Sequence, residues 1–139
     1  GTKKMSKSEI SDFSRINLTD EKDQIINKIK KAKTDPMPMP STIEELNKRP
    51  EAKNLIGIHS SLSGVTLEKS IKEFSGKNFS EFKESLSQVI VDKISPISIE
   101  IKKLLNDKNY LDEILTNGCE QADRISSKKM KKIHEIVGF

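Results

Sequence analysis

Apolar residues recur at helical spacing along nearly the whole chain, and no segment shows the sustained period-two alternation of a half-buried strand. In the first clear stripe, Ile25, Ile29 and Ala32 follow one another, and the lysines between residues 28 and 33 are assigned to other faces. This pattern predicts an amphipathic helix over residues 20–34. Because the links between such stripes are short, the sequence predicts an all-α fold, an antiparallel helical bundle of five or six helices.

Prolines and capping residues divide the middle of the chain. Pro36, Pro38 and Pro40 alternate with methionines, which favours an extended connector because proline fixes φ and lacks an amide donor. A second stripe stops at Gly64, and a third is expected between a Thr66 cap and a terminating Gly76. The apolar positions of these two stripes are Leu55, Ile58 and Leu62, then Leu67, Ile71 and Phe74.

Longer helices are predicted in the second half. Asn78 and Glu81 resemble a capping pattern, and the stripe that follows contains Pro96, which is expected to kink or split the helix. A last helix is expected to open at Asn109 or Asp112 and to run to Gly138. Its predicted apolar face comprises Leu111, Leu115, Ala122, Ile125, Ile133 and Ile136.

Length and composition narrow the class of protein. The 139 residues suit one domain, and 25 basic against 21 acidic side chains give a net charge of +4 with the signs interspersed. The longest apolar run is Val89-Ile90-Val91, far below the about 20 residues that cross a bilayer. The single Cys119 predicts a reducing, intracellular setting and is expected to be a small buried packing residue. A chain that enters a motif so soon after Gly1 is expected to be part of a longer protein.

The pentapeptide Lys4-Met5-Ser6-Lys7-Ser8 is the segment most informative about chemistry. Two ammonium groups three residues apart, separated by a hydroxyl, can converge on a polyphosphate if the loop curls around it. Such cations would stabilise a departing pyrophosphate more than the ground state. The alternative is that this Lys/Ser-rich end is only a solvated tail.

The pentapeptide spells the KMSKS signature of class I aminoacyl-tRNA synthetases, and the rest of the chain resembles the bacterial-type tryptophanyl-tRNA synthetases. The resemblance covers essentially all 139 residues and places the chain at the C-terminal part of that family. The segments that carry it include Ser14-Arg15-Ile16-Asn17-Leu18-Thr19-Asp20, Lys28-Ile29-Lys30-Lys31-Ala32-Lys33-Thr34-Asp35, Arg49-Pro50, Leu62-Ser63-Gly64, Pro96-Ile97 and Val137-Gly138-Phe139.

The resemblance implies a tryptophan-tRNA ligase that uses ATP with Mg2+, tryptophan and tRNA(Trp), and that is a cytoplasmic homodimer at full length. Residues Lys4, Met5, Ser6, Lys7 and Ser8 would bind ATP, and Lys4 and Lys7 would be catalytic, with Lys7 the stronger candidate for a transition-state contact. Lys3 is expected to be an auxiliary or merely a solvated charge. Residues 1–17 would be the loop and connector, and residues 18–139 the helical anticodon-binding domain.

The catalytic Rossmann domain that this family needs has no counterpart in the chain, which shows no βαβ pattern. His59-Ser60-Ser61-Leu62 is not the His-Ile-Gly-His-like signature of that domain. The chain by itself is therefore expected to be inactive. The rival interpretation is a helical interaction or scaffold module with a disordered Lys/Ser-rich tail.

Two basic clusters remain open between two interpretations. The denser one comprises Arg124, Lys128, Lys129, Lys131 and Lys132. It is either a solvated helix end or a surface for tRNA phosphates. Residues 28–33 pose the same alternatives. No metal site is predicted, because Cys119, His59 and His134 are too scattered for ligand spacing.

Overall fold

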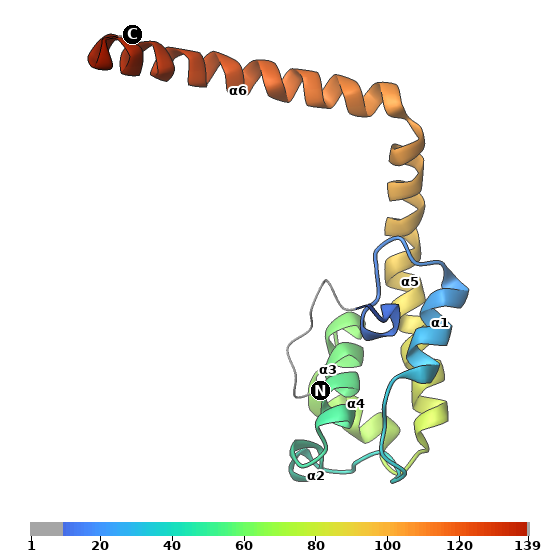
Figure 1. Ribbon diagram of the computed structural model, residues 1–139. Coiled ribbons are helices and arrows are strands. Elements are labelled where there is room, and N and C mark those ends of the chain that lie inside the picture. The colour runs from blue at the N-terminus through green and yellow to red at the C-terminus, as the bar shows by residue number, and fades with distance from the viewer. Residues whose placement is uncertain (1–9, 139) are drawn as a thin grey trace. The chain divides into compact units, whose positions relative to one another are not determined.

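Helices are the regular secondary structure of the computed structural model, which describes residues 10–138 and contains no strand among them (Figure 1). The chain divides into two compact units, with the boundary between Ile99 and Glu100. The all-α class and the number of helices are confirmed for this part. The elements are η1 (Asp12–Ser14), α1 (Lys22–Lys31), α2 (Ile43–Asn47), α3 (Pro50–Ser63), α4 (Leu67–Phe74), α5 (Phe79–Asn106) and α6 (Lys108–Val137).

Side-chain caps set several helix starts in the first unit. The Thr66 hydroxyl accepts a hydrogen bond from the Lys69 amide at 3.4 Å, and the Asn78 side chain accepts one from the Glu81 amide at 2.9 Å, as the sequence predicts. Glu21 and Gln24 form a reciprocal capping box at α1. That helix is shorter than the predicted residues 20–34, because the capping box begins it after Glu21 and Ala32 ends it.

The proline-rich connector is packed into the first unit. Met39 and Pro40 are buried, and the Met39 amide donates to the Lys77 carbonyl at 2.8 Å. The Gly76 amide donates in return to the Met39 carbonyl at 3.1 Å. Gly76 has a φ of 71°, a left-handed conformation that favours glycine, so the predicted α4 terminator also forms this contact. These two hydrogen bonds attach the extended segment to the loop between α4 and α5.

Arg49 holds the same connector from its other side. Its Nε donates to Asp35 Oδ2 at 2.9 Å and its Nη2 to Asp35 Oδ1 at 2.5 Å, a bidentate pair. The guanidinium also donates to the carbonyl oxygens of Pro38 at 2.6 Å and Met37 at 3.2 Å. One side chain therefore satisfies a carboxylate and two loop carbonyls just before Pro50 starts α3.

The core of the first unit lies among α1, α3, α4 and the first half of α5. Its centre is aromatic: the Phe74 and Phe82 rings meet edge to face with centroids 4.9 Å apart, and the buried His59 ring meets Phe74 at 4.9 Å. The Nδ1 of His59 also lies 3.2 Å from the Ser70 hydroxyl. The buried apolar residues are Ile25, Ile29, Met39, Leu46, Ala52, Leu55, Ile56, Ile71, Phe74, Phe79, Phe82, Leu86, Ile90 and Val91.

Lys83 ties the end of α1 to α5. Its Nζ donates to the Lys30 carbonyl at 3.0 Å and to the Ala32 carbonyl at 2.6 Å. These carbonyls lie at the C-terminus of α1, where a cation is favourable. The contact fixes the end of the first helix by a residue more than fifty positions away in the chain.

Pro96 does not split α5, contrary to one of the two predicted outcomes, because the helix is continuous from Phe79 to Asn106. A proline removes the hydrogen bond that its amide would donate to the carbonyl four residues earlier, here that of Asp92. Both Pro96 and Asp92 are exposed, so water can bond that carbonyl and the helix can continue.

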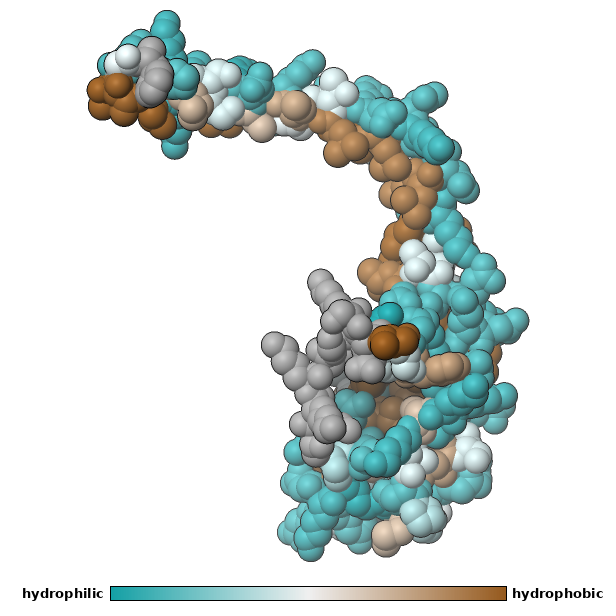
Figure 2. Space-filling model, viewed as in Figure 1, coloured by the Kyte–Doolittle hydropathy of each residue, from teal (hydrophilic) through white to brown (hydrophobic). Residues whose placement is uncertain are grey.

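In the second unit, α6 starts earlier than predicted. Asp107 is its cap, accepting a hydrogen bond from the Tyr110 amide at 3.1 Å, rather than Asn109 or Asp112. The helix ends at Gly138, whose φ is 80°. No residue of α6 is buried, and its predicted apolar face lies along one side of the exposed helix (Figure 2). Cys119 is exposed too, which makes the expectation of a buried packing residue wrong.

Within the described residues, no helix is both long enough and apolar enough to cross a bilayer.

Candidate functional site

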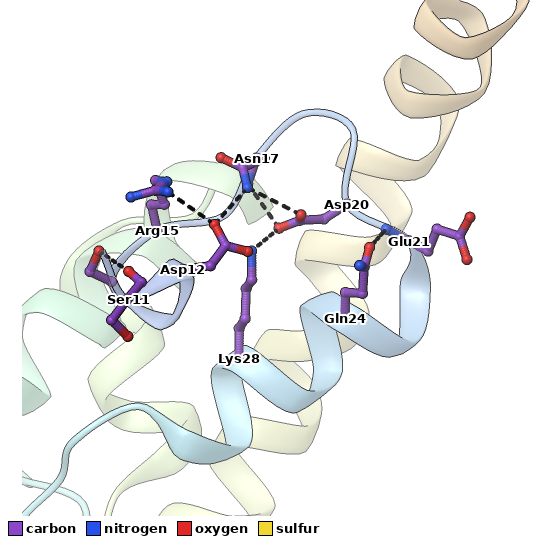
Figure 3. A network of polar contacts seen from close by, with 9 residues as sticks. Ser11, Asp12, Arg15, Asn17, Asp20, Glu21, Gln24 and Lys28 are labelled. Atoms are coloured by element: carbon purple, nitrogen blue, oxygen red, sulfur yellow. Dashed lines mark hydrogen bonds and ion pairs between the residues drawn. The ribbon is translucent and has the colours of Figure 1, made fainter. Parts of the chain in front are cut away.

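The predicted phosphate loop, comprising Lys4, Met5, Ser6, Lys7 and Ser8, lies outside the described residues. What the structure describes is the segment that follows the loop. This segment contains the short helix η1 and a turn that leads into α1. Its polar side chains converge on one lysine of α1 (Figure 3).

Lys28 is the centre of this network. Its Nζ lies 2.6 Å from Asp12 Oδ2 and 2.6 Å from Asp20 Oδ2. Asp12 is in η1, and Asp20 precedes the cap of α1, so the ammonium joins two parts of the segment. Only 8% of the Lys28 side chain and 6% of the Asp20 side chain are exposed. Hence the Lys28–Asp20 pair is nearly buried, and Asp12 closes it on the solvent side.

Asn17 and Arg15 complete the network (Figure 3). The Asn17 backbone amide donates to Asp20 Oδ2 at 2.9 Å, and its side-chain amide donates to Asp12 Oδ1 at 3.0 Å. Arg15 Nη2 lies 3.3 Å from Asp12 Oδ1. Both oxygens of Asp12 therefore have partners, Oδ2 in Lys28 and Oδ1 in Asn17 and Arg15.

These contacts favour the charged forms of Asp12 and Lys28. The hydrogen bond from Lys28 is the main cause that holds the pKa of Asp12 below its ordinary value, and the Asn17 amide adds to it. Burial lowers the pKa of Lys28, but the hydrogen bonds from its ammonium to Asp12 and Asp20 outweigh burial and leave the pKa raised. Two carboxylates thus face the two cations Lys28 and Arg15, and the local charge balances.

A second contact attaches η1 to α1. The Lys31 ammonium lies 4.4 Å from the centroid of the Phe13 ring, a cation–π contact. Ile16, between η1 and the turn, packs against the core of the first unit. The short helix is therefore held by apolar, aromatic and ionic contacts together.

The expectation that every lysine of the first basic cluster lies on other faces of the helix is wrong for Lys28. This residue lies on the core side of α1 between Ile25 and Ile29, and it is paired with carboxylates. Lys30, Lys31 and Lys33 are exposed. The sequence carries a signal for this difference, because residues three and four apart share a helix face and Lys28 is three after Ile25. No periodic pattern points to its partner carboxylates, which the sequence interpretation missed.

The second basic cluster is on α6, and all its members are exposed. At about 100° per residue, four of them fall within about 100° of the helix circumference. The remaining member, Lys129, lies between Ile125 and Ile133 on the apolar side. The basic strip of α6 is Arg124, Lys128, Lys131 and Lys132.

The described residues give little support to a charge-selective ligand groove or to a metal site. A groove of about 810 Å³ lies between α1 and α5 and is lined by Lys22, Lys30 and Lys83 as well as by Glu81 and Glu84. Its charges are mixed, so it does not select one sign of ligand. Among residues 10–138, no three His, Cys, Asp or Glu side chains gather where they could hold a metal ion.

Comparison with known proteins shows which family the chain resembles. The family described as tRNA synthetases class I (W and Y) matches residues 1–94. Proteins named tryptophan–tRNA ligase match all 139 residues, at 49% identity in Agrobacterium fabrum and 48% in Brucella melitensis. The match in Rickettsia felis is 48% identical. The chain spans only 39% of the first two relatives and 42% of the third.

Proposed function

The chain belongs to the class I tRNA synthetases of the tryptophan and tyrosine group, and from that premise we propose that it is the C-terminal part of a tryptophan-tRNA ligase. The observation that carries the proposal is the 49% identity to a tryptophan–tRNA ligase over the whole chain. The family match alone does not decide whether the amino-acid substrate is tryptophan or tyrosine. The relatives favour tryptophan, since they carry that name in several bacteria.

The proposed reaction has two steps, both in the full-length enzyme. An oxygen of the tryptophan carboxylate attacks the α-phosphorus of ATP, which enters with Mg2+ as substrate, and pyrophosphate leaves. A hydroxyl of the terminal adenosine of tRNA(Trp) then attacks the adenylate carbonyl, and AMP leaves. No protein nucleophile is required in either step.

In the first step, Lys4 and Lys7 are proposed to bind the ATP phosphates. Negative charge grows on the leaving pyrophosphate, so a cation there stabilises the transition state more than the bound substrate. Lys7 is proposed to make the stronger transition-state contact. Ser6 and Ser8 supply hydroxyl and backbone donors, and Met5 is proposed as a packing anchor.

We assign residues 1–17 to the loop and its connector, and residues 18–139 to the helical domain that reads the anticodon. The ion pair between Asp12 and Lys28 supports a fixed contact between these two parts, because Asp12 belongs to the connector and Lys28 to the helical domain. Movement of the connector relative to α1 would break an ion pair of 2.6 Å.

The basic strip of α6 is the proposed contact for tRNA phosphates. Its four cations point to the same side of an exposed helix, as a phosphate-binding surface needs. Lys129 lies on the apolar side of the helix, so we leave it out of the proposed strip. The full-length enzyme is further proposed to be a cytoplasmic homodimer.

The experiment that tests the function uses the full-length enzyme. Exchange of labelled pyrophosphate into ATP should depend on tryptophan and stay at background with tyrosine. The 139-residue chain alone should show no exchange, since it spans 39% of relatives such as the Agrobacterium ligase. A full-length protein that binds a partner but exchanges no pyrophosphate would favour the rival class, a helical scaffold module.

A further inference from the structure

The groove between α1 and α5 is lined by a row of side chains from each helix. Ile26 and Lys30 are four residues apart on α1. Ser80, Glu84 and Gln88 follow one another at the same interval on α5. Residues at this spacing share one face of a helix, so each helix turns one face toward the groove. The volume of about 810 Å³ lies within the range of roughly 300 to 1,000 Å³ that small-ligand pockets occupy.

The exposed charges of the groove are not paired with one another. Lys30 on α1 and Glu84 on α5 are both exposed, and neither side chain forms an ion pair within residues 10–138. Glu81 differs, because its carboxylate accepts a hydrogen bond from the Asn78 side chain at the start of α5. Glu84 is therefore the groove carboxylate that can accept hydrogen bonds from a ligand.

Lys83 supplies a fixed donor beside Glu84 in the sequence. Its ammonium donates to the carbonyl oxygens of Lys30 at 3.0 Å and Ala32 at 2.6 Å. An ammonium has three N–H donors, so one remains for a ligand, and the Lys83 side chain lines the groove. Because the two carbonyls already hold this cation in place, a ligand that binds it meets a smaller ordering cost.

A fixed donor beside a free carboxylate suits a nucleobase that carries an amino group. Cytosine and adenine present an amino donor next to a ring-nitrogen acceptor, whereas uracil and guanine present a carbonyl oxygen next to an N–H. Glu84 cannot donate while it is ionised, and Lys83 cannot accept. A carbonyl-bearing base in the same orientation would therefore make two repulsive contacts. Ile26 and Phe79 add apolar surface for the flat ring.

We propose that this groove binds one unstacked anticodon base of tRNA(Trp), with Glu84 accepting from the amino group of the base and Lys83 donating to its ring nitrogen. The inference rests on the proposed function, in which the helical domain reads the anticodon. The tryptophan codon UGG pairs with the anticodon CCA, and each of these three bases carries an amino group. Single-stranded loop bases are the usual targets of sequence-specific RNA recognition. Glu84 is thereby a specificity-determining residue.

The test measures the binding of tRNA(Trp) transcripts to the full-length enzyme. Each transcript carries one anticodon change, from C to U at the first or second position or from A to a G at the third, and so replaces an amino group by a carbonyl oxygen. At the position that occupies the groove, the wild-type enzyme should bind the changed tRNA about 10-fold more weakly. Glu84→Gln should reduce this loss to about 2-fold, since a side-chain amide can donate to the carbonyl oxygen.

Glu44→Gln is the matched control, because Glu44 is an exposed carboxylate of the same unit that does not line the groove. It removes the same charge and should leave the discrimination at all three positions at the wild-type value. Glu84→Gln should also bind one changed tRNA more tightly than the wild-type enzyme does. Partial unfolding cannot produce such a gain.

The possible results separate the groove from the wider proposal. Wild-type discrimination at all three positions in Glu84→Gln would overturn the base-binding role. An equal change at all three positions would overturn it too, and would indicate a general effect of charge or another occupant, such as a peptide. A wild-type enzyme that attaches no tryptophan to tRNA(Trp) would overturn the proposed function itself. The predicted pattern is relaxed discrimination at one position, in Glu84→Gln and not in Glu44→Gln.

Discussion

The ammonium of Lys28 and the carboxylate of Asp20 meet at 2.6 Å, with less than a tenth of either side chain exposed. They are eight residues apart in the chain, and the turn between them is closed by Asn17, whose backbone amide and side chain both donate to Asp20. This pair joins the last turn of α1 to the turn that precedes the helix. The proposed connector meets the helical domain at the same ammonium, through Asp12, whose Oδ2 lies 2.6 Å from Lys28 Nζ.

We expect Lys28→Met to lower the free energy of unfolding by about 3 kcal/mol, because it leaves Asp20 buried without its cation. Lys30→Met is the control, since Lys30 is exposed on the same helix. Its effect should stay within about 0.5 kcal/mol. Urea unfolding of the two variants measures the difference. Equal stability of both variants would show that the Lys28–Asp20 pair contributes nothing.

Much of the fold follows from local signals in the sequence. Helical apolar spacing, the Thr66 and Asn78 caps and the terminating Gly64 and Gly76 all act within a few residues, and the structure confirms them. Pro96 is harder to predict. Whether a proline splits a helix depends on whether the freed carbonyl can reach water, and that depends on exposure.

The site is less predictable, because its contacts join residues that no periodic pattern relates. Arg49 binds Asp35 and two loop carbonyls across more than ten residues, and Asp12 reaches Lys28 in the same way. A lysine on a helix looks solvated unless its position on the apolar side is noticed. Cys119 shows the opposite error, since an apolar helix face does not reveal whether anything covers it.

His59 makes stability depend on pH. Burial lowers the pKa of its imidazole below the ordinary value of 6.5, and the nearby Glu73 opposes this only in part. The unfolded chain therefore binds a proton more readily than the folded one. The contribution of neutral His59 to the free energy of unfolding is complete above about pH 6.5. It is lost as the pH falls toward the pKa of the folded state, with a slope of at most about 1.4 kcal/mol per pH unit.

Urea unfolding at about pH 7.5 and about pH 5.5 measures this loss. His59→Gln is the informative variant, because it keeps a polar side chain next to Ser70 but removes the titration. Its stability should be lower at both pH values, while the difference between them should shrink. An unchanged pH difference in His59→Gln would assign the effect to other groups.

The basic strip of α6 predicts a salt-dependent affinity for tRNA(Trp). Replacing Arg124, Lys128 and Lys132 by Gln should reduce the slope of log affinity against log salt by about 2 to 3, at roughly 0.7 to 0.9 per phosphate contact. The matched control replaces Lys22, Lys72 and Lys93, which are exposed in the first unit, and removes the same charge.

If the strip binds phosphates, only its triple variant changes the slope, whereas anticodon substitutions in the tRNA lower affinity without changing it. Lys129→Gln alone should have no effect on the slope. Circular dichroism verifies that the helices are retained. Equal slopes for the strip and control variants would make the strip a solvated face, and Lys30, Lys31 and Lys33, the exposed lysines of the first basic cluster, would be tested next.

Lys7 is the residue on which the proposed chemistry depends most, and pyrophosphate exchange in the full-length enzyme is the measurement that tests it most directly. Lys7→Ala should lower kcat for tryptophan-dependent exchange by roughly 100-fold or more, because one donor to the departing charge is lost. The KM for tryptophan should stay nearly unchanged, and Lys3→Ala should be much milder. A Lys7→Ala enzyme with wild-type kcat, or with a defect only in tryptophan binding, would contradict the assignment of residues 4–8 as the ATP-phosphate loop.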